Sequence, residues 1–115
     1  MQVEIDQSGK VEQLDTHTVI ACANGEEKAI LITAATKRKV IATLRRSVVP
    51  RKHLIVILFS VLVVLLLKEL ATLPNQMVID QEYTGKDQLI RETVRKLLNR
   101  STRHKWKGVI TGVTQ

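Results

Sequence analysis

The segment that most limits how this chain can fold is the apolar run from Leu54 to Leu67, which only Ser60 interrupts. A membrane-spanning helix needs about 20 apolar residues. At a rise of about 1.5 Å per residue, this run covers only about 21 Å of a hydrocarbon core roughly 30 Å thick. The run is also too long for one ordinary strand. We therefore expect residues 52–70 to form a central, mostly buried helix.

A helix that is apolar all round needs cover on more than one side. Because a chain of 115 residues buries only a modest core, a homodimer interface through residues 54–67 is one expectation. Anchoring in a membrane through residues 54–70, with basic flanks facing the cytoplasm, is the least favoured alternative. Regular strand patterns on both sides of the run argue against it.

The rest of the chain alternates between the two-residue period of strands and the longer period of helices. Val3 and Ile5 share one face of a first strand, and Asn24-Gly25 is a strong hairpin signal. Thr36 is the expected N-cap of the first helix. We expect strands at 2–7, 16–25, 28–35, 76–83 and 104–113, and helices at 36–47, 52–70 and 84–100.

These elements give the order β-β-β-α-α-β-α-β in a single domain over residues 1–115. Three hairpin-connected strands followed by connections through helices predict an α/β fold with a mixed sheet. Cys22 is the only cysteine, so it has no partner for a disulfide within the chain. A reducing compartment, the cytoplasm, is therefore expected.

The chain is basic, with a net charge of +7 at pH 7, and its basic residues cluster. No acidic residue lies between Lys28 and Lys68, and none follows Glu92. Such clustering is typical of a protein that binds a polyanion, either nucleic acid or an anionic membrane surface. Trp106 lies between two lysines, where it is a candidate to stack on a base. The expected nucleic-acid contacts are Lys37, Arg38, Lys39, Arg45, Arg46, Arg51, Lys52, Lys105, Trp106 and Lys107.

Two short motifs suggest a family. The first expected strand contains "VEID" and the fourth contains "MVID", with an apolar helix before the fourth strand and an amphipathic helix after it. Together with the opening three-stranded meander, this order resembles the ribonuclease H-like superfamily over nearly the whole chain. The resemblance implies a ribonuclease H-like mixed sheet in which the first and fourth strands lie side by side.

In that superfamily each of these two strands supplies an aspartate, and the pair binds magnesium for phosphodiester hydrolysis or transfer. The resemblance assigns those positions to Asp6 and Asp80. Carboxylate oxygens are the hard ligands that Mg²⁺ or Mn²⁺ prefers, and strands about 4.8 Å apart allow two aspartates to share an ion. Glu82 and Glu4 each lie two residues from one of the aspartates, on the same strand face. The expected metal ligands are Asp6, Asp80 and Glu82.

The chain departs from the family pattern in two places. The family's glutamate lies early in the helix before the fourth strand, where this chain has no carboxylate. Glu69, near the end of that helix, and Glu82 are the candidates to complete the catalytic set. The C-terminal helix that usually carries a last ligand is not expected, because Gln115 follows closely on the fifth strand.

Two functions therefore follow from the sequence. The first is a magnesium-dependent nuclease or phosphoryl-transfer protein that acts on nucleic acid. Asp6 precedes Ser8-Gly9, however, and an aspartate in such a place is also a good turn former. The second function is accordingly a non-catalytic module with the same fold that binds nucleic acid or assembles with partners.

Overall fold

The computed structural model describes residues 2–23, 26–80, 83, 85–101 and 106–113. These residues form an α/β fold with a mixed five-stranded sheet, which confirms the expected fold class. The strands are β1 (Gln2–Ser8), β2 (Thr18–Ala23), β3 (Lys28–Ile32), β4 (Gln76–Asp80) and β5 (Val109–Val113). The helices are α1 (Ala34–Arg45), α2 (Leu54–Lys68) and α3 (Asp87–Ser101), with a short 3-10 turn η1 (Arg51–His53) before α2.

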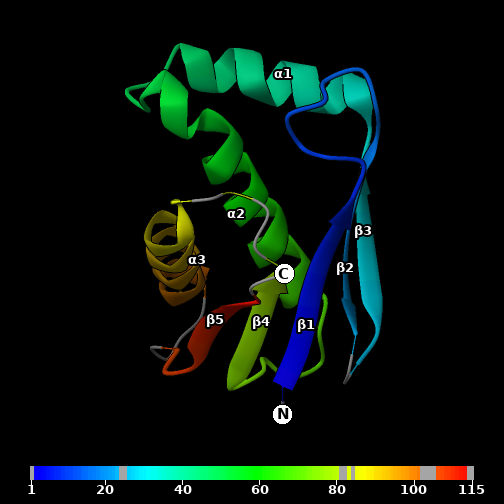
Figure 1. Cartoon of the computed structure of the whole chain (residues 1–115), viewed down its shortest axis with the longest axis vertical. Coiled ribbons are helices and arrows are strands. Elements are labelled where there is room, and N and C mark those ends of the chain that lie inside the picture. The colour runs from blue at the N-terminus through cyan, green and yellow to red at the C-terminus, as the bar shows by residue number, and fades with distance from the viewer. Residues whose placement is uncertain (1, 24–25, 81–82, 84, 102–105, 114–115) are drawn as a thin grey trace.

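The sheet has the strand order β3-β2-β1-β4-β5. The three N-terminal strands pair antiparallel, whereas β4 lies parallel to both β1 and β5. Because β2 runs against both of its neighbours, β1, β3 and β4 all point the same way. Their carboxyl ends therefore meet at one end of the sheet, where α1 follows β3 after a single residue and crosses the molecule (Figure 1).

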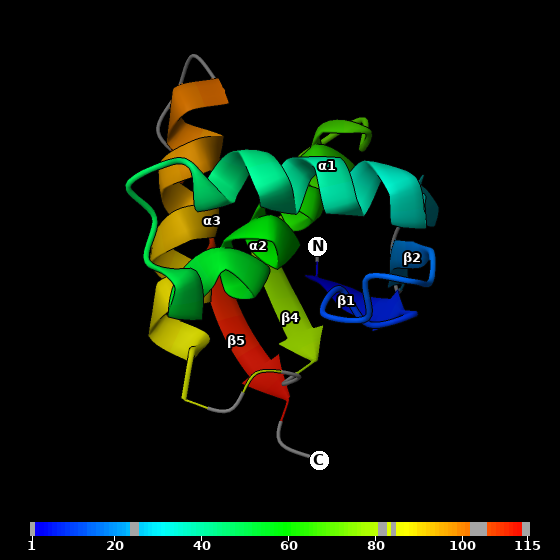
Figure 2. The same ribbon diagram turned by 90° about the horizontal axis from the view of Figure 1, so that it is seen from above.

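The three helices lie on one face of the sheet (Figure 2). The alternation along β1 shows which face this is: Val3 and Ile5 are buried, whereas Glu4 and Asp6 are exposed. No described helix or strand covers the opposite face. The fold is therefore a two-layer arrangement with one open sheet face, and that face carries the first candidate aspartate.

The apolar run forms α2, whose 15 residues include ten buried side chains. The helix packs against β2, β3, α1 and α3, so other elements of the same chain bury most of its apolar surface. Ser60 is fully buried, and its hydroxyl donates to the carbonyl of Val56 at 2.8 Å. Phe59 packs its ring against that of Tyr83, with centroids 5.3 Å apart. Among the described residues, no helix combines the length and apolarity needed to cross a membrane.

Several element boundaries differ from the expected ones. The N-cap of α1 is Thr33, not Thr36: the Thr33 hydroxyl accepts a hydrogen bond from the Thr36 amide at 3.2 Å. His17 holds the same helix end, because its Nδ1 accepts from the amide of Ala34 at 2.9 Å. The structure describes the fourth strand over Gln76–Asp80, and positions 81 and 82 of the expected strand lie outside the described residues. The fifth strand begins at Val109, because the described residues 106–108 before it are not in a strand.

Candidate functional site

The two candidate aspartates lie at the same end of neighbouring strands. Ile5 of β1 pairs with Ile79 of β4 in parallel register, and the next position on each strand is an aspartate. Asp80 is also the last residue of β4 and pairs with Val113 of β5. Since neighbouring strands are about 4.8 Å apart, the backbones of Asp6 and Asp80 lie next to each other. The strand register thus brings together two residues that are far apart in the sequence.

Asp6 lies on the open face of the sheet and its side chain is exposed. Its Oδ1 accepts a hydrogen bond from the backbone amide of Gln7 at 2.8 Å. Among the described residues, no donor bonds to Oδ2. The second oxygen is therefore open to a ligand that approaches this face, such as a hydrated cation.

The structure does not place Glu69 with the two aspartates. Glu69 is the exposed C-cap of α2 and lines a groove between that helix and β3, whereas Asp6 lies on the open face of the sheet. Because α2 packs on the face of the sheet that the helices cover (Figure 2), the structure does not bring Glu69 to Asp6, and its role as a catalytic carboxylate stays a prediction. Glu82 lies outside the described residues. Within those residues, no group of three or more metal-ligating side chains gathers.

Glu4 is the nearest further carboxylate on β1. It lies on the open face, one pleat before Asp6, and pairs with Val78 of β4. Glu4 therefore shares the face of Asp6, but it lies two residues further from the carboxyl end of the strand. The carboxylates of the helices lie on the opposite, helix-covered side of the sheet from Asp6 and Glu4.

A hydrogen-bonded group that the sequence did not reveal links the end of β1 and the loop after it to Tyr83, which follows β4. The Gln7 side chain donates to the hydroxyl of Tyr83 at 3.1 Å, and this hydroxyl lies 3.2 Å from Oε1 of Glu12, to which it donates. Tyr83 is one of only three aromatic residues in the chain, which is the one signal that could have pointed to it. The contact connects the ends of the two strands that carry Asp6 and Asp80.

Lys37 is not available to nucleic acid, which corrects the expectation from charge clustering. Its side chain is fully buried, and Nζ donates to Gln13 O at 2.7 Å, Thr18 Oγ1 at 2.8 Å and Lys10 O at 3.3 Å. Lys37 therefore fastens the loop between β1 and β2 to α1. A buried ammonium with three acceptors is a structural group, because no donor remains for a phosphate.

We expect Lys37→Met to lower the free energy of unfolding at neutral pH by about 2 kcal/mol, because the variant leaves buried acceptors without a donor. Lys39→Met is the matched control: Lys39 is exposed on the same helix, and its replacement should change stability by less than about 0.5 kcal/mol. Urea unfolding of the three proteins measures both effects. Equal stability of the two variants would contradict the structural role of Lys37.

Burial lowers the pKa of the Lys37 ammonium below its usual 10.5, although Asp15 and Glu12 oppose the shift. The folded protein therefore releases this proton at a lower pH than the unfolded chain does. Between the lowered pKa and 10.5 the unfolded chain holds more protons, so stability rises with pH in this window. The loss of stability in Lys37→Met should accordingly grow as the pH is raised towards 10.5, which urea titrations at several pH values measure.

Trp106 also differs from the expectation. Only 7% of its surface is exposed, and its Nε1 donates to Pro74 O at 2.9 Å. The side-chain oxygen of Asn99 accepts from the Trp106 amide, and the guanidinium of Arg95 lies 5.0 Å from the ring centre. The indole is therefore a packing residue between α3 and the sheet, and it does not present a face on which a base can stack.

The remaining basic residues expected to contact nucleic acid are mostly exposed. Arg38 donates to the carbonyl of Leu14 at 2.8 Å, and the others on α1 and η1 form no ion pair with the described residues. Lys107 is exposed, and Lys105 lies outside the described residues. The basic surface formed by α1 and η1, here called the α1 surface, comprises Arg38, Lys39, Arg45, Arg46, Arg51 and Lys52.

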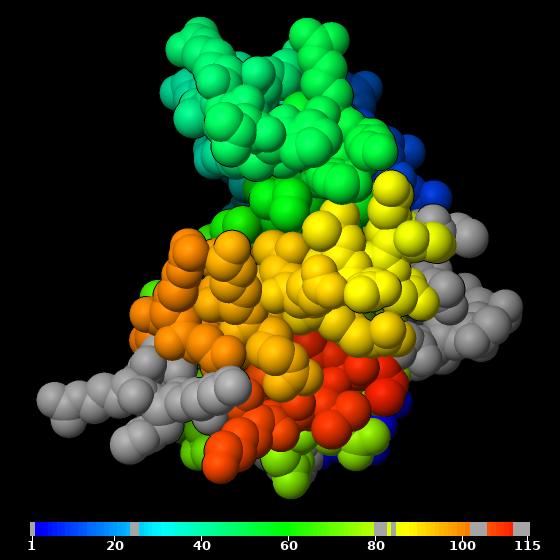
Figure 3. All heavy atoms as spheres, turned by 90° about the vertical axis from the view of Figure 1, so that its left-hand side faces the viewer, coloured from blue at the N-terminus to red at the C-terminus, as the bar shows by residue number. Residues whose placement is uncertain are grey.

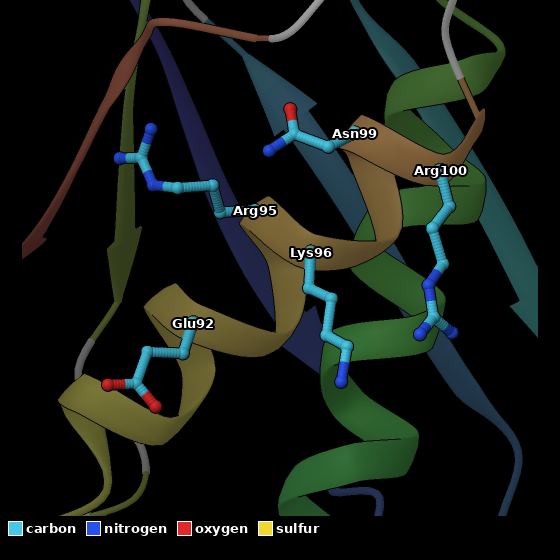
Figure 4. Close-up of a pocket in the computed structure, with 5 residues that line it drawn as sticks. All are labelled: Glu92, Arg95, Lys96, Asn99 and Arg100. Atoms are coloured by element: carbon cyan, nitrogen blue, oxygen red, sulfur yellow. The ribbon is translucent and has the colours of Figure 1, made fainter.

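A second basic region covers the outer side of α3, which spans the middle of the face shown in Figure 3. It contains an open hollow of about 500 Å³ lined by Glu92, Arg95, Lys96, Asn99 and Arg100. Figure 4 shows that these side chains spread apart: Arg95 points towards the strands, whereas Lys96 and Arg100 extend to the other side of α3, where α2 lies in this view. The hollow lacks polar groups that converge on one point, so it is a solvated helix face rather than a ligand pocket.

Comparison with known proteins adds no relative: the chain matches no protein-family model, no curated protein and no solved structure.

Proposed function

We propose that the chain has a ribonuclease H-like fold and acts as a divalent-metal-dependent nuclease or phosphoryl-transfer protein. The observation that carries the proposal is the register of β1 and β4, in which Asp6 and Asp80 follow the paired residues Ile5 and Ile79. The strand order β3-β2-β1-β4-β5 supports the same reading, because it sets the first and fourth strands side by side. Ligand sites of α/β sheets generally lie at the carboxyl ends of parallel strands, where these two aspartates are.

The donor set fits Mg²⁺ or Mn²⁺. Mg²⁺ commonly binds through one or two carboxylates and keeps several water molecules, so two aspartates without a third ligand suffice. Such an ion polarises a phosphoryl oxygen and lowers the pKa of bound water. In this proposal Asp6 and Asp80 would hold the ion, and Oδ2 of the exposed Asp6 is the ligand atom that the described geometry leaves accessible.

The α1 surface is suited to hold the nucleic-acid backbone during this reaction. Helix α1 begins one residue after β3, so it lies at the end of the sheet where β1 and β4 also end. Its described exposed cations have no acidic partners, and they can replace the counterions of a phosphate backbone. The hollow on α3 lies on the outer side of the helical layer, which makes it the less suitable of the two regions.

Cleavage assays test the proposal directly. Single-stranded DNA, duplex DNA, RNA and an RNA–DNA hybrid are incubated with the protein in Mg²⁺, in Mn²⁺ or in EDTA. We expect at least one substrate to be cut only when the metal is present. We also expect either ion to raise the melting temperature of the protein, because it binds the folded state preferentially. Absence of both effects would contradict the metal site.

We expect the double variant Arg45→Ala/Arg46→Ala to bind nucleic acid more weakly than the wild type. Removing two phosphate contacts should reduce the slope of log K against log salt by about 2 for duplex DNA. Lys96→Ala/Arg100→Ala removes the same charge from α3 and should leave the slope closer to that of the wild type. Fluorescence anisotropy over a salt series measures both slopes. Equal slopes for the two variants would show that binding does not depend on the α1 surface.

A second candidate function has one observation in its favour. No third carboxylate joins the aspartates within the described residues, so the same fold can serve as a nucleic-acid-binding module without catalysis. This alternative predicts salt-dependent binding that persists in EDTA and no cleavage with any metal. The assays above therefore distinguish the two functions.

A further inference from the structure

The two edges of the sheet are protected differently. At the β5 edge, Arg91 donates to the carbonyl of Ile110 at 3.2 Å, and Arg95 donates to the carbonyl of Gly108 at 3.0 Å. Helix α3 thus occupies one backbone acceptor of β5 and one on the residue just before it. At the β3 edge, no described residue outside β2 hydrogen-bonds to the backbone of residues 28–32. An edge strand with open backbone groups is a template for pairing with another strand.

An apolar groove of about 480 Å³ runs beside this edge, between β3 and α2. Ile30 and Ile32 line it from the strand, and Leu62 and Leu65 line it from the helix. Two of the most exposed large apolar side chains of the described structure also border it, since Leu31 is 60% exposed and Leu65 is 48% exposed. The edge therefore combines unpaired backbone groups with apolar surface, as interfaces formed by strand addition do.

We propose that this edge is a symmetric interface at which a second copy of the chain adds its own β3 in antiparallel orientation. The residue sizes along β3 suit such a pairing. When the two-fold axis passes at Ile30, each Leu31 meets the Ala29 of the other copy, so a large side chain lies opposite a small one on the open face. On the helix face the two Ile30 side chains meet, and the grooves with Leu62 and Leu65 come together.

The charges at the two ends of β3 favour the antiparallel arrangement. Helix α1, beyond the Ile32 end, has no acidic residue and exposes Lys39. The opposite end carries the exposed acids Glu27 and Glu69 together with two lysines. In antiparallel pairing, the end of β3 that carries both acids and lysines in one copy lies against the end near the basic helix α1 in the other. Parallel pairing would instead place the two basic α1 helices next to each other. Like charges placed opposite each other disfavour association.

The interface also explains which part of α2 remains uncovered. Most of this helix is buried within its own chain, and Leu65 is its large apolar residue that stays largely exposed, in the groove beside β3. A second copy would cover Leu65, which lies in the groove, without any change in the packing of the buried positions. The interface of the homodimer that the apolar run predicts is thus located at the groove between β3 and α2 and at the edge of β3.

Sedimentation equilibrium over a concentration series tests the proposal with Leu31→Lys and a matched control, Val109→Lys. Val109 is 54% exposed on the same sheet face but belongs to the guarded edge strand β5. We expect a wild-type dimer, a dissociation constant raised at least about tenfold in Leu31→Lys, and no change in Val109→Lys. Leu65→Lys should act like Leu31→Lys, while circular dichroism confirms that each variant is folded.

A wild-type chain that stays monomeric throughout the series would overturn the proposal. A dimer that Val109→Lys weakens as much as Leu31→Lys does would also overturn it, because the contact would then involve the open sheet face rather than the β3 edge. Neither result depends on the proposed nuclease activity, since the measurement needs no metal and no substrate.

Discussion

Asp6→Asn should reduce metal-dependent phosphodiester cleavage by about 10³-fold, a loss of roughly 4 kcal/mol of transition-state stabilisation. The reason is that, in the proposed metal site, Asp6 would supply a carboxylate oxygen at the strand end where Asp80 lies on the neighbouring strand. The amide of asparagine has the same shape, but it lacks the charge that holds a divalent cation. The side chain is exposed, so the variant should fold as the wild type does. Initial rates at saturating Mg²⁺ measure the effect.

Asp15→Asn is the matched control, because it makes the same chemical change at an exposed position in the loop between β1 and β2. Its cleavage rate should remain within a factor of about two of the wild type. Glu4→Gln tests the neighbouring carboxylate on the same face, and we expect a smaller effect than at Asp6, because Glu4 lies one pleat further from the strand ends. Equal activity of the wild type and Asp6→Asn would refute the role of Asp6 as a ligand.

The metal dependence of stability gives an independent view of the same site. Mn²⁺ should raise the melting temperature of the wild type, whereas Asp6→Asn should show little or no rise, because the ion then has fewer carboxylates to bind. This readout needs no substrate. It therefore separates a protein that binds metal but does not cut the tested nucleic acids from a protein that has no metal site.

Much of the fold could be predicted from the sequence because two of its signals are strong. The run from Leu54 to Leu67 is apolar on every side, so it had to be a buried element, and its length excluded an ordinary strand. The alternation of Val3 and Ile5 with polar residues identified the covered face of β1. Boundaries were less accurate, since Thr33 and Thr36 are both good capping residues, and the contact of His17 with the Ala34 amide, which helps to fix where α1 begins, is tertiary.

The candidate site was predictable in part. The positions of Asp6 and Asp80 on neighbouring strands depend on strand order, and the order of the elements constrains strand order well. The position of Glu69 depends instead on the direction in which α2 crosses the sheet and on where that helix ends, which no local pattern in the sequence specifies. A carboxylate near a helix end can be assigned to a site only when the packing of the whole helix is known.

The errors among the basic residues have a common physical cause. Charge clustering treats every lysine as exposed, yet Lys37 lies four residues before Ile41, on the buried stripe of α1. Its acceptors come from the loop after β1, which the sequence does not place near this helix. Burial also explains why the expectation for Trp106 was wrong. The indole ring packs against Gly108, where a Cβ atom would lie 2.0 Å from the ring. This packing, rather than the charge of the two flanking lysines, determines where the indole lies.

The turn after β1 gives the largest expected effect on stability. Gly9 has a φ of +70°, and a Cβ atom added to it would lie 2.1 Å from the carbonyl oxygen of His17. We expect Gly9→Ala to lower the free energy of unfolding by about 4 kcal/mol, the sum of the left-handed backbone cost and the clash with a fixed backbone atom. Displacing His17 would also disturb α1, because its side chain holds the amide of Ala34. Urea unfolding measures the loss.

Gly85 provides the matched control within the same chain. It has a similar φ of +78°, but a Cβ atom added there would meet nothing within 4 Å. Gly85→Ala should therefore cost only the backbone term, about 1 kcal/mol. The difference between the two variants isolates the contact of Gly9 with His17 from the conformational preference that both glycines share. If both variants lost the same stability, the turn after β1 would not be held against His17 as closely as the structure shows.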